Sequence, residues 1–205
     1  MSKSLKIAAW IISVLFHPLN LVLVGSIISI LFIPGISKEP MYALGLTVLL
    51  LLYIIPLAFV PLCWVYAKIT RQEFSEKQQR LTLLFSTSVI YISAAYNLVA
   101  QHPFVLLDSY IVASACLMVL SFCITIFWKI SLHAIGVGGF LALVIQLSLS
   151  AYFFAYLLIP IALIIAGLVM SARLYLHAHT LAQVVCGFIV GVGVVLLCLN
   201  IGFYH

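Results

Sequence analysis

The sequence predicts an all-α membrane protein, a polytopic bundle of about six or seven transmembrane helices. The composition is 66% apolar and only 6% charged, whereas a soluble domain has roughly 25% charged residues. The apolar residues form long continuous runs, and about 20 such residues suffice for a helix to cross a bilayer. Because these runs do not alternate between polar and apolar residues, as barrel strands do, they are expected to cross as helices.

The apolar runs can be assigned to spans in chain order. The first run contains His17-Pro18 in its middle. Proline has no amide hydrogen, so we predict a kink or a break there, with the run forming either one tilted span or a re-entrant pair. Gly136, Gly138 and Gly139 would let another helix approach the fifth run closely. The expected spans are residues 5–34, 41–68, 82–101, 104–127, 131–149, 151–171 and 180–202.

Charge and cysteine usage exclude several classes of protein. A formal net charge of +5 fits loops that face an anionic membrane surface, and it predicts no nucleic-acid partner. The cysteines lie inside apolar runs without CxxC spacing, so neither a disulfide framework nor a zinc module is indicated. We expect one domain over residues 1–205, in which residues 1–76 supply N-terminal spans and a polar loop.

Polar residues are concentrated in three segments that follow one another at even intervals. The segments 69–81, 129–133 and 172–180 are each separated by two expected spans. Because an even number of crossings returns the chain to the same face, the three segments should meet on one side of the membrane. Charged and titratable groups beside membrane spans are costly, so this meeting point is the default candidate for a functional site.

The side chains of these segments suit a phosphate group. Lys77 and Arg80 are one helical turn apart and can point the same way. Arg173 can hold phosphate oxygens in a two-pronged manner. Four residues separate His179 from Gln183, so on one helix the amide can hydrogen-bond the imidazole and fix its tautomer.

The acidic residues do not form a magnesium site. The sequence has four of them, Glu39, Glu73, Glu76 and Asp108, and only Glu73 and Glu76 are expected on the face of the polar segments. A phosphatase that works without a metal ion or other cofactor therefore fits better than a metal-assisted one, with a histidine attacking phosphorus and a second histidine protonating the leaving oxygen.

The second and third polar segments resemble motifs of the type 2 phosphatidic acid phosphatase superfamily of membrane-embedded lipid phosphatases. Its third motif has Ser-Arg, a histidine six residues after the arginine and an aspartate four further on. Here Arg173 is followed by His179 and Gln183. The family's Pro-Ser-Gly-His corresponds to the segment from Ile130 to His133. The histidine-rich run and His17-Pro18 also look like a branch of this superfamily from Bacteroidetes-type bacteria.

The first motif differs most from the family pattern. The family places a lysine seven residues before Arg-Pro, but Glu73 stands seven residues before Arg80 and Leu81 stands where proline would be. Lys77 would have to replace the family's lysine. The resemblance covers residues 77–190, so residues 77–205 would be a core like that of the superfamily.

The resemblance implies a role for each site residue. His179 would be the nucleophile that forms a phosphohistidine, and His133 the general acid. Gln183 would take the place of the aspartate that orients the nucleophile, and being neutral it would lack the charge that stabilises the imidazolium. The phosphate clamp would consist of Arg173, Ser131, Lys77 and Arg80. The substrate would be a membrane lipid phosphate or an isoprenoid diphosphate, and the protein would lie in a bacterial inner membrane as a multi-pass protein.

Two other functions remain open from the sequence. A catalytically degenerate relative would use the same pocket to bind an anionic lipid headgroup or a partner. A metal-dependent enzyme or transporter would use His133, His177 and His179, because three histidines suit zinc. The distribution of positive charge predicts that the polar segments face the cytoplasm, although the superfamily more commonly faces its site outward. Apart from the clamp, this side would carry Lys3, Lys6, Lys68, Arg71 and Lys129, against Lys38 on the other.

Overall fold

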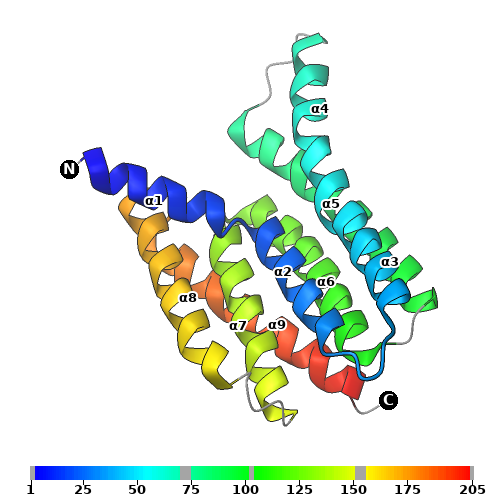
Figure 1. The fold of residues 1–205 in the computed structure, drawn as a ribbon. Helices are drawn as coiled ribbons and strands as arrows, with labels where there is room; N and C mark the ends of the chain where they lie inside the picture. Colours follow the sequence, from blue (N-terminus) through cyan, green and yellow to red (C-terminus); the bar gives the residue numbers. More distant parts are fainter. Residues whose placement is uncertain (1–2, 70–74, 102–103, 151–155, 204–205) are drawn as a thin grey trace.

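The computed structural model describes residues 3–69, 75–101, 104–150 and 156–203, and these residues form helices without any strand (Figure 1). Six helices are long and apolar enough to cross a membrane, or up to seven spans result if the bent pair α1–α2 counts as one. The predicted all-α, multi-pass helical bundle is therefore confirmed. The helices are α1 (Lys3–Leu15), α2 (Pro18–Leu31), α3 (Lys38–Leu49), α4 (Ile55–Ile69), α5 (Glu76–Gln101), α6 (Val105–Phe127), α7 (Leu132–Leu149), α8 (Leu158–Tyr175) and α9 (Leu181–Phe203).

The first apolar run is broken, as predicted, and α1 and α2 are bent by 45° relative to each other. Pro18 begins α2, where its missing amide hydrogen costs nothing. The Asn20 side chain donates to the carbonyls of Val14 (3.0 Å) and Leu15 (2.9 Å). These carbonyls lack their usual donors four residues on, because Pro18 has no amide hydrogen and the Leu19 amide donates to His17. The break is thus closed locally by side-chain hydrogen bonds. In Figure 1, α1 runs across the upper end of the bundle while α2 descends into it, and α1 packs on α8.

The second apolar run also departs from a single regular helix. A π-helical turn, η1 (Leu50–Ile54), connects α3 to α4 just before Pro56. Because Pro56 has no amide hydrogen, it cannot bond the carbonyl of Leu52 one turn earlier. The buried Tyr91 hydroxyl of α5 donates to that carbonyl at 2.9 Å. Tyr91 thereby satisfies a backbone group in the core and fixes α5 against this helix.

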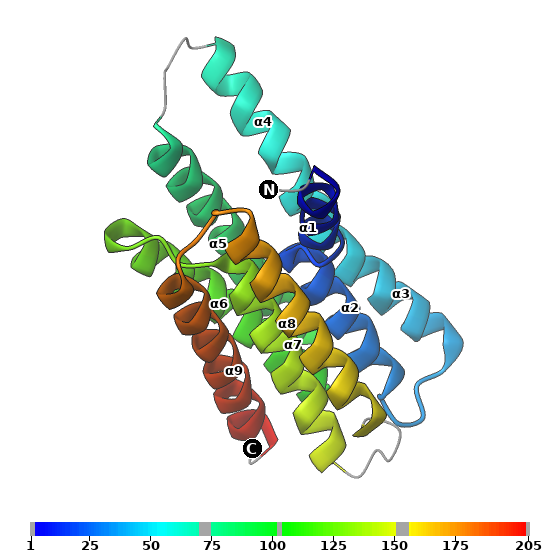
Figure 2. The same cartoon turned by 90° about the vertical axis from the view of Figure 1, so that its left-hand side faces the viewer.

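The centre of the bundle is α7, which contacts α2, α6, α8 and α9 (Figures 1 and 2). Of its span, 67% is buried, against 22–44% for the other candidate spans. Glycines bring its backbone against that of α9. A Cβ on Gly191 would collide with the Ile135 carbonyl, and one on Gly187 would lie 2.8 Å from the Ser131 carbonyl. A Cβ on Gly138 of α7 would likewise collide with the Phe188 carbonyl of α9. The expectation that glycines of the fifth run permit close helix contact is therefore confirmed.

The three polar segments lie at the same end of the bundle, as the even spacing of spans predicts. The start of α5, the segment between α6 and α7 and the segment between α8 and α9 all lie at the upper end in Figure 1, where α1 also begins, whereas α9 ends at the opposite end. One boundary differs from the prediction. The sixth span was expected at 151–171, but α8 runs from Leu158 to Tyr175, which places Arg173 in its last helical turn. Glu73 and Arg71 lie outside the described residues.

The glycine contact between α7 and α9 gives a direct test. Replacing Gly191 by alanine inserts a methyl group against a backbone carbonyl that cannot move aside, so we expect a loss of stability of about 1–3 kcal/mol. A Cβ on Gly193, in the same helix, would meet nothing within 4 Å. Gly193→Ala should therefore be neutral or stabilise by up to about 1 kcal/mol through helix propensity. Thermal unfolding in detergent would measure both, and equal effects would contradict the close packing.

Candidate anion site at one end of the bundle

Hydrogen bonds connect the three polar segments. An Arg80 guanidinium nitrogen (Nη2) on α5 donates to the Ile130 carbonyl just before α7. The Ser131 amide donates to the Gln183 carbonyl on α9 at 3.3 Å. Segments that are about 50 residues apart in the chain are thereby held together by backbone carbonyls and by the close α7–α9 contact.

Gln183 orients the ring of His179. The Nδ1 atom of His179 lies 3.1 Å from the Gln183 Oε1 atom, which also accepts the Thr180 amide hydrogen at 3.1 Å. Because a backbone amide can only donate, this contact identifies the oxygen of the glutamine amide. The Nδ1 atom of His179 therefore carries the hydrogen, and its Nε2 atom keeps a free lone pair. The predicted hydrogen bond between these two side chains is confirmed.

Thr180 and Gln183 also form the start of α9. The Gln183 amide lies 3.4 Å from the Thr180 hydroxyl oxygen, and the Gln183 side chain returns to the Thr180 amide. This is a capping box, in which threonine and a glutamine three residues later satisfy each other's backbone donors. The residue at 183 thus serves two purposes, helix capping and orientation of His179. The pattern Thr-x-x-Gln is visible in the sequence and predicts this cap.

The surroundings of His179 favour its neutral form. Burial lowers the pKa of His179 to about 4, the Gln183 hydrogen bond opposes the shift, and the positive charges of Arg173, Arg80 and Lys129 lower the pKa further. At neutral pH the Nε2 lone pair is therefore available to attack an electrophile.

The turn after α8 brings Arg173 close to His179. The Ala178 amide donates to the Arg173 carbonyl at 3.2 Å, and the His177 amide donates to the Leu174 carbonyl at 3.0 Å. This is a Schellman motif, and His177 takes the left-handed conformation with a φ of 50°. His177 is exposed, and histidine is among the residues that tolerate this conformation. The turn thus explains His177 without a role in binding.

Neither arginine has an acidic partner among the described residues. Arg173 donates from Nη1 to the Ser13 hydroxyl at 3.3 Å, and Arg80 donates to the Ile130 carbonyl. The Nε atoms of both guanidiniums are buried without a hydrogen-bond partner. Desolvated cations without a counter-charge are costly, and inside a membrane protein they mark a site for an anion or a substrate.

His133 is held by the break between α1 and α2. Its Nε2 atom lies 3.0 Å from the Ser13 carbonyl oxygen, which can only accept, so Nε2 carries the hydrogen and Nδ1 the lone pair. The ring of His17 meets that of His133 edge-on, with centroids 5.4 Å apart and planes at 88°. Sequence reasoning missed Ser13 and His17 as parts of this site. The only signal was Pro18, which predicts that carbonyls one turn earlier need other partners.

Ser131 and Lys77 each form a hydrogen bond with the backbone of a helix. Ser131 is fully buried and caps α7, its hydroxyl accepting the Ala134 amide hydrogen at 3.4 Å. The Lys77 ammonium donates to the Ile126 carbonyl at 2.7 Å near the C-terminus of α6, where a cation is favourable. The structure thus brings Arg80, Arg173, His133, His179 and Gln183 together.

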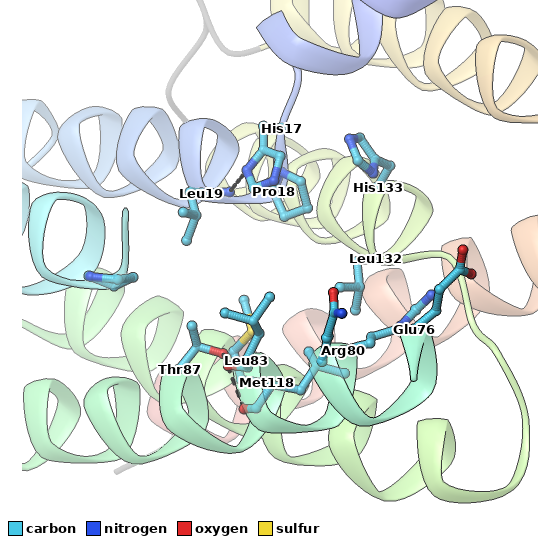
Figure 3. Close-up of a pocket in the computed structure, with 13 residues that line it drawn as sticks. His17, Pro18, Leu19, Glu76, Arg80, Leu83, Thr87, Met118, Leu132 and His133 are labelled. Atoms are coloured by element: carbon cyan, nitrogen blue, oxygen red, sulfur yellow. Dashed lines mark hydrogen bonds between the residues drawn. The ribbon is translucent and has the colours of Figure 1, made fainter. Parts of the chain in front are cut away.

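A pocket of about 370 Å³ adjoins this cluster (Figure 3). Neither Ser131 nor Lys77 lines it. Its polar end is formed by His17, His133, Arg80, Gln79 and Glu76. The remaining wall is largely apolar, and such a combination of an apolar wall and a few polar groups is typical of small-molecule sites. This wall comes from α2, α4, α5, α6 and α7 and consists of Pro18, Leu19, Pro56, Leu83, Leu84, Thr87, Met118 and Leu132.

No protein-family model, curated protein or solved structure matches this chain. Within the ranges that the structure describes, no group of three or more His, Cys, Asp or Glu residues could hold a metal ion. His133, His177 and His179 therefore do not form the ligand set that a metal-dependent function would use.

The orientation of His179 can be tested by its titration. NMR of histidine-labelled protein in detergent should give His179 a midpoint near pH 4. Gln183→Asp should raise this pKa, because a carboxylate favours the charged imidazolium. Gln183→Ala should lower it, because the glutamine hydrogen bond raises the pKa. A pKa that is the same in all three proteins would show that residue 183 does not contact His179.

Proposed function

We propose that this protein is a membrane-embedded phosphatase that acts on a lipid phosphate or an isoprenoid diphosphate in a bacterial inner membrane. The observation that carries the proposal is the position of two guanidiniums, without acidic partners among the described residues, beside a neutral, oriented imidazole. Guanidinium is suited to phosphate oxygens by shape and by charge. The motif resemblance to the type 2 phosphatidic acid phosphatases supports the same reaction, and the multi-pass fold supports a lipid substrate.

The proposed reaction has two steps. In the first, the Nε2 lone pair of His179 forms a bond to phosphorus while the bond from phosphorus to the leaving oxygen breaks. His133 enters this step as an imidazolium with a second proton on Nδ1, donates that proton to the leaving oxygen and returns to its neutral form. His179 becomes a cationic phosphohistidine that keeps its Nδ1 hydrogen. In the second, water attacks phosphorus and gives a proton to His133, the N–P bond breaks, and its electron pair returns to Nε2. Arg80 and Arg173 neutralise the phosphoryl oxygens throughout.

Gln183 sets the expected speed of this reaction. Its amide oxygen holds the His179 ring in the tautomer that the first step needs. It carries no negative charge, however, so the cationic phosphohistidine gains no ion pair. In serine proteases, replacing the orienting aspartate by its amide lowers kcat by about 10⁴. We therefore propose a slow enzyme whose turnover is limited by the charge at position 183.

A second candidate function is binding without turnover. Ser13 holds groups that the reaction would use, through its hydroxyl at Arg173 and its carbonyl at His133. Together with the neutral Gln183, this contact favours a site that recognises an anionic lipid headgroup or an anionic partner and releases it unchanged.

Phosphate release separates the two candidates. Purified protein should release phosphate from at least one of phosphatidate, undecaprenyl diphosphate and farnesyl diphosphate without added metal, and His179→Ala should abolish the release. Gln183→Asp should raise kcat at least about tenfold, because the carboxylate stabilises the imidazolium. His177→Asn is the matched control, since asparagine also tolerates the left-handed turn, and it should retain the wild-type rate.

Two results would go against the phosphatase proposal. Turnover that survives in His179→Ala would remove the nucleophile from the mechanism. Absence of release from the whole panel, in protein that still binds these lipids, would establish the binding function in place of catalysis.

A further inference from the structure

His17 presents a fixed hydrogen-bond donor at the edge of the pocket. Its Nδ1 atom accepts the Leu19 amide hydrogen at 3.3 Å and so caps α2. In the neutral ring the hydrogen must then reside on Nε2. That atom has no hydrogen-bond partner among the described residues, and the side chain is exposed. Pro18 and the edge-on contact with His133 keep the ring at this place.

The pocket changes from polar to apolar along its length. Glu76, Arg80 and His133 lie toward one end of the pocket, and Leu19 and Thr87 lie toward the other. Figure 3 shows Leu83, Thr87 and Met118 opposite His17 and Pro18, with Arg80 beside Leu132. Of the described residues, the only carboxylate in the lining belongs to Glu76, at the exposed start of α5, and it forms no ion pair with Arg80. The charge pattern therefore matches an amphiphile with an anionic head.

The pocket shares two of its lining residues with the anion site. Arg80 and His133 line the pocket, and the charge of Arg80 also acts on the ring of His179. A ligand whose phosphate lies between Arg80 and Arg173 would therefore extend past Arg80 into the apolar part of the pocket. At about 370 Å³ the pocket is near the lower limit of ligand sites, roughly 300–1,000 Å³, which suits one hydrocarbon chain and leaves no room for a second.

We propose that this pocket selects single-chain lipid phosphates and that His17, which lies outside all three motif segments, is a specificity-determining residue. Its Nε2 hydrogen bonds a phosphate oxygen on the side of the chain, while Leu83, Leu84, Thr87 and Met118 contact the first carbons of that chain. This inference rests on the proposed anion site, and it adds the substrate class: an isoprenyl-type phosphate in preference to a two-chain phosphatidate or to inorganic phosphate.

Binding, measured without turnover, tests the inference separately from the phosphatase activity. Calorimetry would compare farnesyl phosphate, didecanoyl phosphatidate and inorganic phosphate on full-length His179→Ala protein in detergent. Farnesyl phosphate should bind at least about tenfold more tightly than either of the other two, the factor of one well-placed contact. In the same background, His17→Asn keeps a side chain that can cap α2 and removes the longer-reaching donor to the phosphate oxygen, so farnesyl phosphate should lose about tenfold in affinity.

A second binding experiment fills the apolar part of the pocket with a large side chain. Leu83→Trp places a large ring in the apolar wall and should abolish farnesyl phosphate binding. Val89→Trp, on the same helix at a position that is 52% exposed and outside the pocket lining, is the matched control and should bind normally. Unchanged binding in Leu83→Trp, equal affinity for phosphatidate, or no binding of farnesyl phosphate would each overturn the inference. If binding follows the expected pattern but the wild-type protein releases no phosphate, the pocket stands and the phosphatase proposal fails.

Discussion

The backbone contact between α7 and α9 is the constraint on which the site depends. Gly191 and Gly187 let α9 approach the carbonyls of α7 so closely that no side chain fits between them. At the end of this contact the Ser131 amide bonds the Gln183 carbonyl. Because both partners are backbone groups next to His133 and His179, the relative position of the two histidines is set by helix packing and not by flexible side chains. The central, largely buried position of α7 keeps this arrangement rigid.

Two prolines interrupt the hydrogen bonding of their helices, and the carbonyl groups left without helical donors find different partners. Pro56 has no amide hydrogen to donate to the Leu52 carbonyl in the core, and the Tyr91 hydroxyl donates to this carbonyl instead. Pro18 ends the first helix in a break whose Ser13 carbonyl bonds His133. In a membrane protein such groups must find partners inside the protein. The first case stabilises the fold, whereas the second brings α1 into the anion site and fixes the tautomer of His133.

Much of the fold follows from the sequence, because apolar runs of sufficient length can only cross the membrane as helices, and the parity of spans then assigns the polar segments to one end. The contact between His179 and Gln183 was predictable because it depends only on helical spacing. The involvement of Ser13 and His17 could not be predicted. A carbonyl without a helical donor can accept a hydrogen bond from any donor that tertiary packing brings near. Arg173 was expected in a loop, but α8 continues to Tyr175 and ends only there, in a Schellman motif whose left-handed residue is His177 and not a glycine. Whether Ser131 and Lys77 also touch a ligand stays a prediction beside the capping contacts they make.

The central claim is that Arg80 and Arg173, which have no acidic partner in the part of the chain that the structure describes, hold a phosphoryl group against the Nε2 atom of His179. Orthovanadate mimics such a group, and a structure of the protein determined with it would test this claim most directly. The account predicts vanadium bonded to His179 Nε2, with both guanidiniums donating to its oxygens and the His179–Gln183 hydrogen bond intact. Vanadate bound elsewhere, or bound at His179 with either arginine turned away, would contradict it.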